Sequence, residues 1–251
     1  MKKNVLGEKF LATRRKDRYH LLDMLRGICI ILVVIYHAMY NLTAIFSVDV
    51  RPFGTVVMDS FRMCFVVCLV LISGISCSLT RSNAKRGIKT LAAGLLVTAV
   101  TYFAIPDQLI IFGILHFFGV AMLLYAAIGR FLEKIPMLIG AAVSVVLFVI
   151  SFQVFSVEIY TNSEILNLLL GMIGFNTGII SADYYPLFPW IFIFLAGSFL
   201  GRPFKKGTAP KLFRANPVKA LSFVGRHTLL VYLIHQPIIY GGMYLWFEYF
   251  A

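Results

Sequence analysis

The sequence predicts an all-α integral membrane protein, a polytopic helix bundle, from three observations. Sixty per cent of its 251 residues are hydrophobic and only 14% are charged, whereas about 25% of the residues in a soluble domain are charged. The hydrophobic residues gather in runs of about 20, the length that a helix needs to cross about 30 Å of hydrocarbon. The net charge of +12 is concentrated in short segments between those runs, which is typical of membrane topology and argues against a nucleic-acid groove.

Seven segments are predicted to cross the membrane. In order they are about 21–42, 56–80, 87–105, 109–128, 136–155, 186–201 and 228–248. The sixth segment is the shortest, so it has to stand nearly upright or be partly covered by its neighbours. One further apolar run at 165–181 is interrupted by three glycines, and it reads either as an additional span or as a re-entrant segment.

Basic residues set the predicted orientation. Seven Lys or Arg lie in the first 18 residues and seven in 202–227, with four in 81–89 and two in 129–135. The loops at the opposite ends of the predicted spans contain a single basic residue, Arg51. Because cytoplasmic loops carry the excess of Lys and Arg, the N-terminus is predicted to lie in the cytoplasm and the C-terminus outside the plasma membrane.

The same asymmetry bears on the run at 165–181. If that run crossed the membrane, the strongly basic loop 202–227 would lie outside. A re-entrant or interfacial segment on the outer face is therefore favoured, since irregular backbone at membrane depth is tolerated only where it is buried in protein or lines a cavity. The predicted domains are a basic cytoplasmic tail at 1–18 and a single transmembrane domain at 19–251.

Ionisable residues on the first predicted span are the most informative local feature. Asp23 and Arg26 are three residues apart, so they share a helix face and can neutralise each other; the alternative is that this pair only locks the helix end. His37 lies 14 residues beyond Asp23, about 21 Å along a helix. Asn41, one turn further on, is expected to orient the His37 imidazole. Ionisable groups in hydrocarbon cost roughly 2.5 to 3.5 kcal/mol each, which makes them functional candidates.

Other polar residues of the predicted spans fall into two layers. The cytoplasmic layer also holds His20, Arg226 and His227, and the middle or outer layer also holds Asp59, Arg62, His116, Asp183, Tyr184, Trp190, His235 and Gln236. For each histidine, the alternative to a functional role is a buried imidazole that only packs. The four cysteines lie inside apolar runs, and no metal site is expected because histidine and carboxylate ligands are not placed beside them.

Four segments resemble a known family of membrane enzymes. They are Asp23-x-Leu25-Arg26-Gly27 with the distal Tyr36-His37, 112–120 (FGILHFFGV), 183–190 (DYYPLFPW) and 225–237 (GRHTLLVYLIHQP). The first is similar to the first helix of the transmembrane acyltransferase superfamily. Together, in matching order over nearly the whole chain, the four are similar to bacterial members of the heparan-α-glucosaminide N-acetyltransferase catalytic-domain family.

That resemblance implies an acyl-CoA-dependent transmembrane acetyltransferase. Acetyl-CoA is expected as the co-substrate at the basic cytoplasmic face, and the acceptor as an amine or hydroxyl of a cell-envelope glycan or amino sugar at the outer side. The expected roles are His37 as general base, with Asn41 and His116 at the catalytic centre; Asp23, Arg26, Arg226 and His227 at acetyl-CoA; and Asp183, Tyr184, Trp190, His235 and Gln236 at the acceptor. The bilayer is the further partner, nucleic acid is not expected, and the choice between monomer and homo-oligomer stays open.

Three alternatives to direct transfer by His37 stay open. An acyl-histidine relay would replace direct attack on the thioester. A secondary transporter or exporter of a cell-envelope glycan precursor would also use membrane-embedded acids, bases and histidines, but the sequence lacks the inverted repeat that many transporters carry. A non-catalytic scaffold is the third alternative. Interhelical hydrogen bonds average only about 0.6 kcal/mol, which poorly explains so many ionisable groups.

Overall fold

The computed structural model describes residues 18–51, 53–154 and 157–250. Apart from one isolated bridge between Glu158 and Asn176, the regular structure of these residues is helical, which confirms the predicted all-α class. The predicted basic tail at 1–18 falls outside the described residues except for Arg18. The chain divides into two compact units, one from Met1–Phe65 and Ala209–Ala251 and the other from Val66–Thr208.

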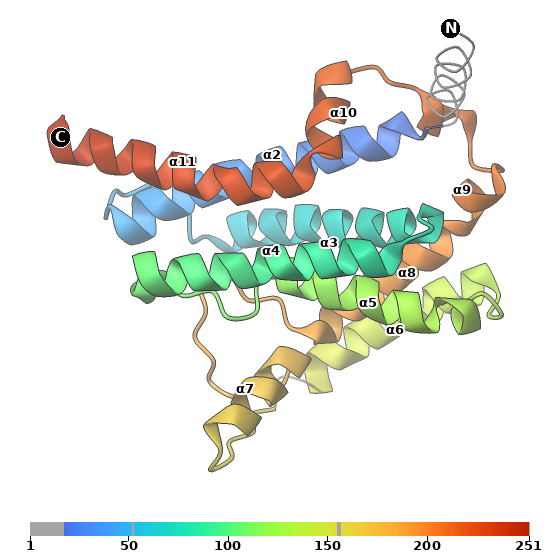
Figure 1. The fold of residues 1–251 in the computed structure, drawn as a ribbon, viewed down its shortest axis with the longest axis horizontal. Coiled ribbons are helices and arrows are strands. Elements are labelled where there is room, and N and C mark those ends of the chain that lie inside the picture. The colour runs from blue at the N-terminus through green and yellow to red at the C-terminus, as the bar shows by residue number, and fades with distance from the viewer. Residues whose placement is uncertain (1–17, 52, 155–156, 251) are drawn as a thin grey trace, which may run out of the picture. The chain divides into compact units, whose positions relative to one another are not determined.

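The first unit is built around the first long helix. Its elements are α2 (His20–Tyr40), a π-helical turn (Asn41–Ile45), the first residues of α3 (Val56–Leu79), a 3-10 turn (Lys211–Arg214), α10 (Lys219–Arg226) and α11 (Thr228–Tyr249). Both α10 and α11 pack against α2 (Figure 1). Segments from the two ends of the sequence thus come together around one helix.

Two glycines allow α2 and α10 to approach closely. A Cβ atom on Gly27 would overlap the carbonyl oxygen of Leu221, and one on Gly225 would overlap the carbonyl oxygen of Asp23. Small residues let helix backbones touch in this way, which is the usual means of packing helices in membranes. The crossing explains in structural terms why the first and last of the four motif segments both contain glycine.

The second unit contains the remaining α-helices. They are the rest of α3, α4 (Asn83–Ala104), α5 (Ile114–Leu132), α6 (Met137–Val154), α7 (Glu164–Ile173), α8 (Leu187–Leu200) and the short α9 (Arg202–Lys206). Helix α4 packs on α5, and α8 packs on α5 and α6. Close approach again depends on glycine, because a Cβ atom on Gly74 or Gly197 would overlap backbone oxygen of the facing helix.

Six helical segments among the described residues are long and apolar enough to cross a membrane. They are His20–Ile45, Val56–Leu79, Asn83–Ala104, Ile114–Leu132, Met137–Val154 and Leu187–Lys206. The sixth predicted span is thus longer than expected, since α9 continues α8. The seventh predicted span forms α11, 22 residues long, which is not among the six. The adjacent polar residues His235 and Gln236 lower its hydropathy.

The apolar run at 165–181 forms only a short helix. Helix α7 has 10 residues, about 15 Å at 1.5 Å per residue, which is half of what a span needs. It ends at Gly174, whose φ of +136° is accessible to glycine. Beyond it, Ala182 N–H donates to Leu109 O and Tyr185 N–H to Phe112 O. This geometry fits a segment that does not span; its position on the outer face stays a prediction.

Candidate active site

Asp23 ties the start of α2 to two arginines. The Asp23 side chain is 7% exposed; its Oδ1 accepts from Arg26 Nη1 at 3.1 Å and its Oδ2 from Arg18 Nε at 2.6 Å. The predicted Asp23–Arg26 pair is therefore confirmed, and Arg18 is a partner that helical spacing did not reveal. Arg26 Nη1 also donates to the carbonyl oxygen of Gly225 at 3.3 Å. One buried carboxylate between two guanidinium groups leaves this end of the helix positively charged.

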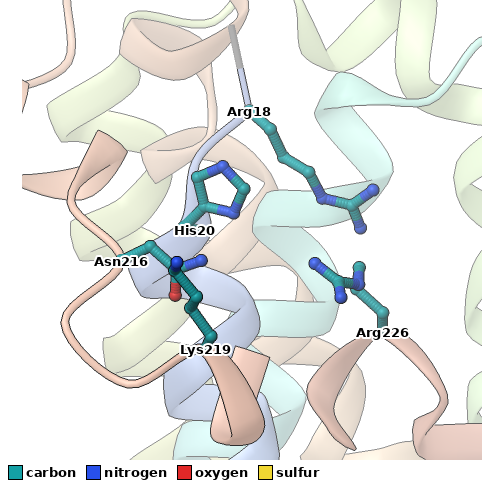
Figure 2. Close-up of a pocket in the computed structure, with 5 residues that line it drawn as sticks. All are labelled: Arg18, His20, Asn216, Lys219 and Arg226. Atoms are coloured by element: carbon teal, nitrogen blue, oxygen red, sulfur yellow. The ribbon is translucent and has the colours of Figure 1, made fainter. Parts of the chain in front are cut away.

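A cavity of about 570 Å³ opens beside this cluster. Figure 2 shows the lining residues: Arg18 lies just before α2 and His20 is its first residue, while Asn216 lies in the segment that leads into α10 and Lys219 and Arg226 lie in α10 itself. The five described lining residues include three cations and no carboxylate. Their charge suits an anionic ligand, because guanidinium groups bind phosphate oxygens through charge-assisted hydrogen bonds.

Two neutral side chains of the cavity offer further hydrogen bonds. The Asn216 Oδ1 atom accepts from Ser222 Oγ at 2.7 Å, which leaves the amide NH2 of Asn216 as a donor. The Nδ1 atom of His20 is buried and has no hydrogen-bond partner within the described part of the chain. This cavity can therefore combine cationic and neutral donors around one ligand.

The cavity contains some of the residues predicted at acetyl-CoA and not others. Arg226 lines it, and Asp23 and Arg26 are linked to it through Arg18. The ring of His227 instead contacts the Phe223 carbonyl oxygen through Nδ1 at 2.8 Å and is not among the lining residues. Asn216 and Lys219 were missed. Their signal in the sequence was only membership of the basic loop 202–227.

His37 lies in a polar chain between α2 and α11. Gln236 Nε2 lies 3.1 Å from His37 Nδ1, and Gln236 Oε1 accepts from Asn41 Nδ2 at 2.9 Å. The expected direct contact between Asn41 and His37 is thus replaced by a link through Gln236, although both residues do belong to one polar network. The reason is tertiary, since packing of α11 on α2 places the Gln236 amide between them.

A second imidazole lies beside His37. The ring centroids of His37 and His235 are 5.1 Å apart, and His235 is 5% exposed. The His235 Nδ1 atom lies within hydrogen-bond distance of the carbonyl oxygen of Tyr232. Because a carbonyl only accepts, His235 Nδ1 carries the hydrogen. Residues predicted for catalysis and for acceptor binding therefore gather in one place in the first unit.

The predicted Asp59–Arg62 pair forms at the start of α3, near the same region. Arg62 Nε lies 3.7 Å from Asp59 Oδ1. The Arg62 guanidinium carbon lies 5.6 Å from the ring centroid of Tyr36, and the Tyr36 and His37 rings meet edge-on at 6.1 Å. A cation, an aromatic face and a carboxylate thus belong to the surroundings of His37.

His116 lies in the second unit and has a partner at each ring nitrogen. Gly113 N–H donates to His116 Nδ1 at 3.3 Å, and His116 Nε2 lies 3.2 Å from Thr98 Oγ1. The Thr98 hydroxyl donates to Ile110 O at 2.6 Å, so its oxygen accepts from His116 Nε2–H. These contacts select the neutral Nε2–H tautomer and join α4 to the start of α5. The catalytic role of His116 stays a prediction.

The predicted acceptor residues 183–190 also lie in the second unit. Asp183 Oδ2 accepts from the backbone N–H of Ile114 at 3.1 Å, which caps α5 in the manner of an N-terminal carboxylate. Tyr184 donates its hydroxyl to Gly171 O at 2.6 Å, and burial raises the pKa of the Tyr184 phenol. Trp190 is buried against Tyr185. Each has a packing role here, and contact with substrate stays a prediction.

Comparison with known proteins agrees with the motif resemblance. A family model described as heparan-alpha-glucosaminide N-acetyltransferase, catalytic, matches residues 18–237. No curated protein and no solved structure matched the chain in the corresponding searches. The matched range begins at Arg18 and ends just after Gln236, so it includes the basic cavity and the His37 network.

Proposed function

This chain belongs to the heparan-α-glucosaminide N-acetyltransferase catalytic family, a family of membrane acetyltransferases, and from that premise we propose its reaction. It moves an acetyl group from cytosolic acetyl-CoA to an amine or hydroxyl of a glycan or amino sugar at the outer side of the plasma membrane. The donor enters at the basic cavity, and His37 is the general base. The N-terminus lies in the cytoplasm, as the distribution of Lys and Arg favours.

The charge of the cavity supports the choice of donor. Arg18, Lys219 and Arg226 line a space of about 570 Å³, within the range of pockets that hold small ligands. The head of acetyl-CoA carries phosphates and an adenine, which call for cations and neutral hydrogen-bond donors. Asp23 holds Arg18 in place and is not itself a lining residue. Acetyl-CoA binding at this cavity is the first step of the proposed reaction.

The position of His37 supports the transfer step. His20 at the cavity and His37 lie on the same helix, 17 residues apart, or about 25 Å along its axis. The pantetheine arm of the donor carries the thioester away from the phosphates and toward the middle of the helix. A helix that presents a cationic site near one membrane face and an imidazole toward the other suits transfer from a cytosolic donor to an outer acceptor.

The proposed chemistry is a direct acyl transfer. His37 Nε2 takes a proton from the acceptor amine or hydroxyl as the acceptor nitrogen or oxygen attacks the thioester carbonyl carbon. The new C–N or C–O bond forms, the C–S bond breaks, and the thiolate of CoA receives the proton from His37. An imidazole is the side chain whose unperturbed pKa is closest to neutral pH, so it suits both proton transfers.

One observation carries this proposal: the matched family range includes a cation-lined cavity and a part-buried polar network around His37, and helix α2 contributes a residue to each. The test uses purified protein in lipid nanodiscs with acetyl-CoA labelled in its acetyl group and a panel of amino sugars and glycans. We expect labelled acceptor and free CoA in equal amounts. Proton-coupled uptake of a glycan precursor into proteoliposomes without any CoA requirement would instead identify a transporter and overturn the proposal.

A further inference from the structure

The hydrogen bonds around His37 bear on which ring nitrogen carries its proton. Asn41 Nδ2 donates to Gln236 Oε1, and Gln236 Nε2 faces His37 Nδ1. In this direction the Gln236 amide donates to Nδ1, so neutral His37 carries its hydrogen on Nε2. An Nε2–H group donates a proton and cannot accept one. The proposed general base needs the opposite tautomer.

The same three side chains can form the chain in the opposite direction. Amide oxygen and nitrogen have nearly the same size, so rotating both amides by 180° keeps every heavy-atom contact. His37 Nδ1–H then donates to Gln236 Oε1, and Gln236 Nε2 donates to Asn41 Oδ1. The link to Gln236 is the one side-chain hydrogen bond of Asn41 within the described residues, and Asn41 is 1% exposed. Reversal therefore breaks no other described hydrogen bond of Asn41.

The neighbouring histidine lacks this freedom. His235 Nδ1 faces the carbonyl oxygen of Tyr232, and a backbone carbonyl cannot rotate to present a donor. Its tautomer is therefore fixed while that contact lasts.

We propose that Gln236, held by Asn41, is a positioning residue that sets the tautomer of His37, and that reversal of the Asn41–Gln236–His37 chain makes His37 Nε2 a proton acceptor. This inference rests on the proposed function. It replaces the expected acceptor-binding role of Gln236 with one that acts through His37. After proton transfer the imidazolium keeps Nδ1–H on Gln236 Oε1 and presents Nε2–H to the departing thiolate.

Two substitutions separate the directions of the chain. In Asn41→Asp the new carboxylate can only accept, so Gln236 must donate to it and turn Oε1 toward His37, which fixes the Nδ1–H tautomer. Gln236→Glu fixes the same tautomer directly. Gln236→Met keeps the approximate volume and removes both hydrogen bonds. Gln153→Met, on an exposed position of α6, is the matched control.

The inference predicts a division between these variants. Gln236→Met should lower kcat about 100-fold with KM for acetyl-CoA changed less than about threefold, since general-base catalysis is lost while donor binding stays. Asn41→Asp and Gln236→Glu should each keep kcat within about tenfold of the parent. In protein with ¹⁵N-labelled histidine, the His37 signals, identified by their loss in His37→Gln, should report the Nδ1–H form in Asn41→Asp.

A merely structural amide predicts the reverse order, with Gln236→Met tolerated and the two acidic variants impaired because they bury a charge. That result, or equal losses in all three variants, would overturn the inference. If Gln236→Met keeps kcat while His37→Ala is inactive, the tautomer role is wrong and the general base stands. Full activity of His37→Ala would contradict the proposed function, in which His37 is the general base. The paired acidic variants keep the test decisive if one of them fails to fold.

Discussion

Each of the two units holds a histidine in polar contacts, the half-buried His37 in the first and the buried His116 in the second, and the two sets of contacts differ in whether they can reverse. His116 in the second unit meets a backbone N–H and a hydroxyl whose own hydrogen is committed to Ile110 O. His37 in the first unit meets the Gln236 amide, which can donate or accept. A buried imidazole with fixed partners stays in one tautomer, whereas one held by an amide can exchange proton-donor and proton-acceptor states.

The largest expected effect is on His37. His37→Ala should lower the transfer rate roughly 10²- to 10⁴-fold because the proton acceptor is lost. His37→Gln keeps some hydrogen bonding but cannot accept a proton at neutral pH, so it should be nearly as inactive. The measurement is acetyl transfer per folded protein, alongside acetyl-CoA affinity. Near-normal transfer by His37→Gln would show that His37 is not the general base and that, in the proposed reaction, it has no more catalytic role than His116.

His116→Ala should instead act on stability. It leaves the Gly113 N–H without its ring partner and opens a gap between α4 and α5, and a lost buried hydrogen-bond partner costs about 1–3 kcal/mol. Thermal unfolding in detergent should report a lower Tm, while transfer per folded molecule stays close to that of the parent. A loss of turnover in fully folded His116→Ala would instead support the catalytic role that the sequence predicted.

The cavity predicts a smaller effect, confined to the donor. Replacing Lys219 and Arg226 by Gln should raise KM for acetyl-CoA about tenfold, since each charge-assisted hydrogen bond to a phosphate contributes roughly 1.5–3 kcal/mol before solvent screening. The value of kcat should change little. Lys211→Gln, an exposed neighbour that does not line the cavity, controls for the change in net charge. Equal KM values for acetyl-CoA in the double variant and the control would contradict acetyl-CoA binding at this cavity.

The smallest effect concerns the pair between Glu133 and Lys205 in the second unit. The hydrogen bond from Lys205 Nζ to Glu133 Oε1, at 2.5 Å, lowers the pKa of that carboxyl. A lowered carboxyl pKa adds stability above its unfolded value near 4.3 and loses it as pH falls through the folded value. Both side chains are about half exposed, so Lys205→Ala should cost no more than about 0.5 kcal/mol at pH 7.

Thermal unfolding of the parent and Lys205→Ala between pH 3 and 7 measures this contribution. The difference in Tm between them should shrink toward the acid end. Transfer activity at pH 7 should be unchanged, because Glu133 and Lys205 are neither lining residues of the basic cavity nor members of the polar chain around His37. A pH-independent difference would mean that Lys205 acts through packing instead of charge.

The part of the site that could be predicted from the sequence depends on helical spacing between nearby residues. Asp23 and Arg26 form their pair because residues three apart share a helix face, which any helix guarantees. The same rule predicted a direct contact between Asn41 and His37, but helical spacing cannot predict a side chain that comes from another helix, α11. Gln236 lies 199 residues from His37 along the chain, so its place between them depends on how two helices pack.

Residues close in sequence predicted the helical class, the apolar segments that form the six long helices and α11, and the Asp23–Arg26 pair. The distribution of Lys and Arg favoured a re-entrant segment at 165–181, where the structure has the short helix α7. Tertiary structure decided the rest. It gathered Asn216, Lys219 and Arg226 around Arg18, inserted Gln236 between Asn41 and His37, and gave Asp183 and Tyr184 partners within the second unit. The cavity depends on the close crossing of α2 and α10 at Gly27 and Gly225, and the distance between two helix backbones is a property of both surfaces that neither segment encodes by itself.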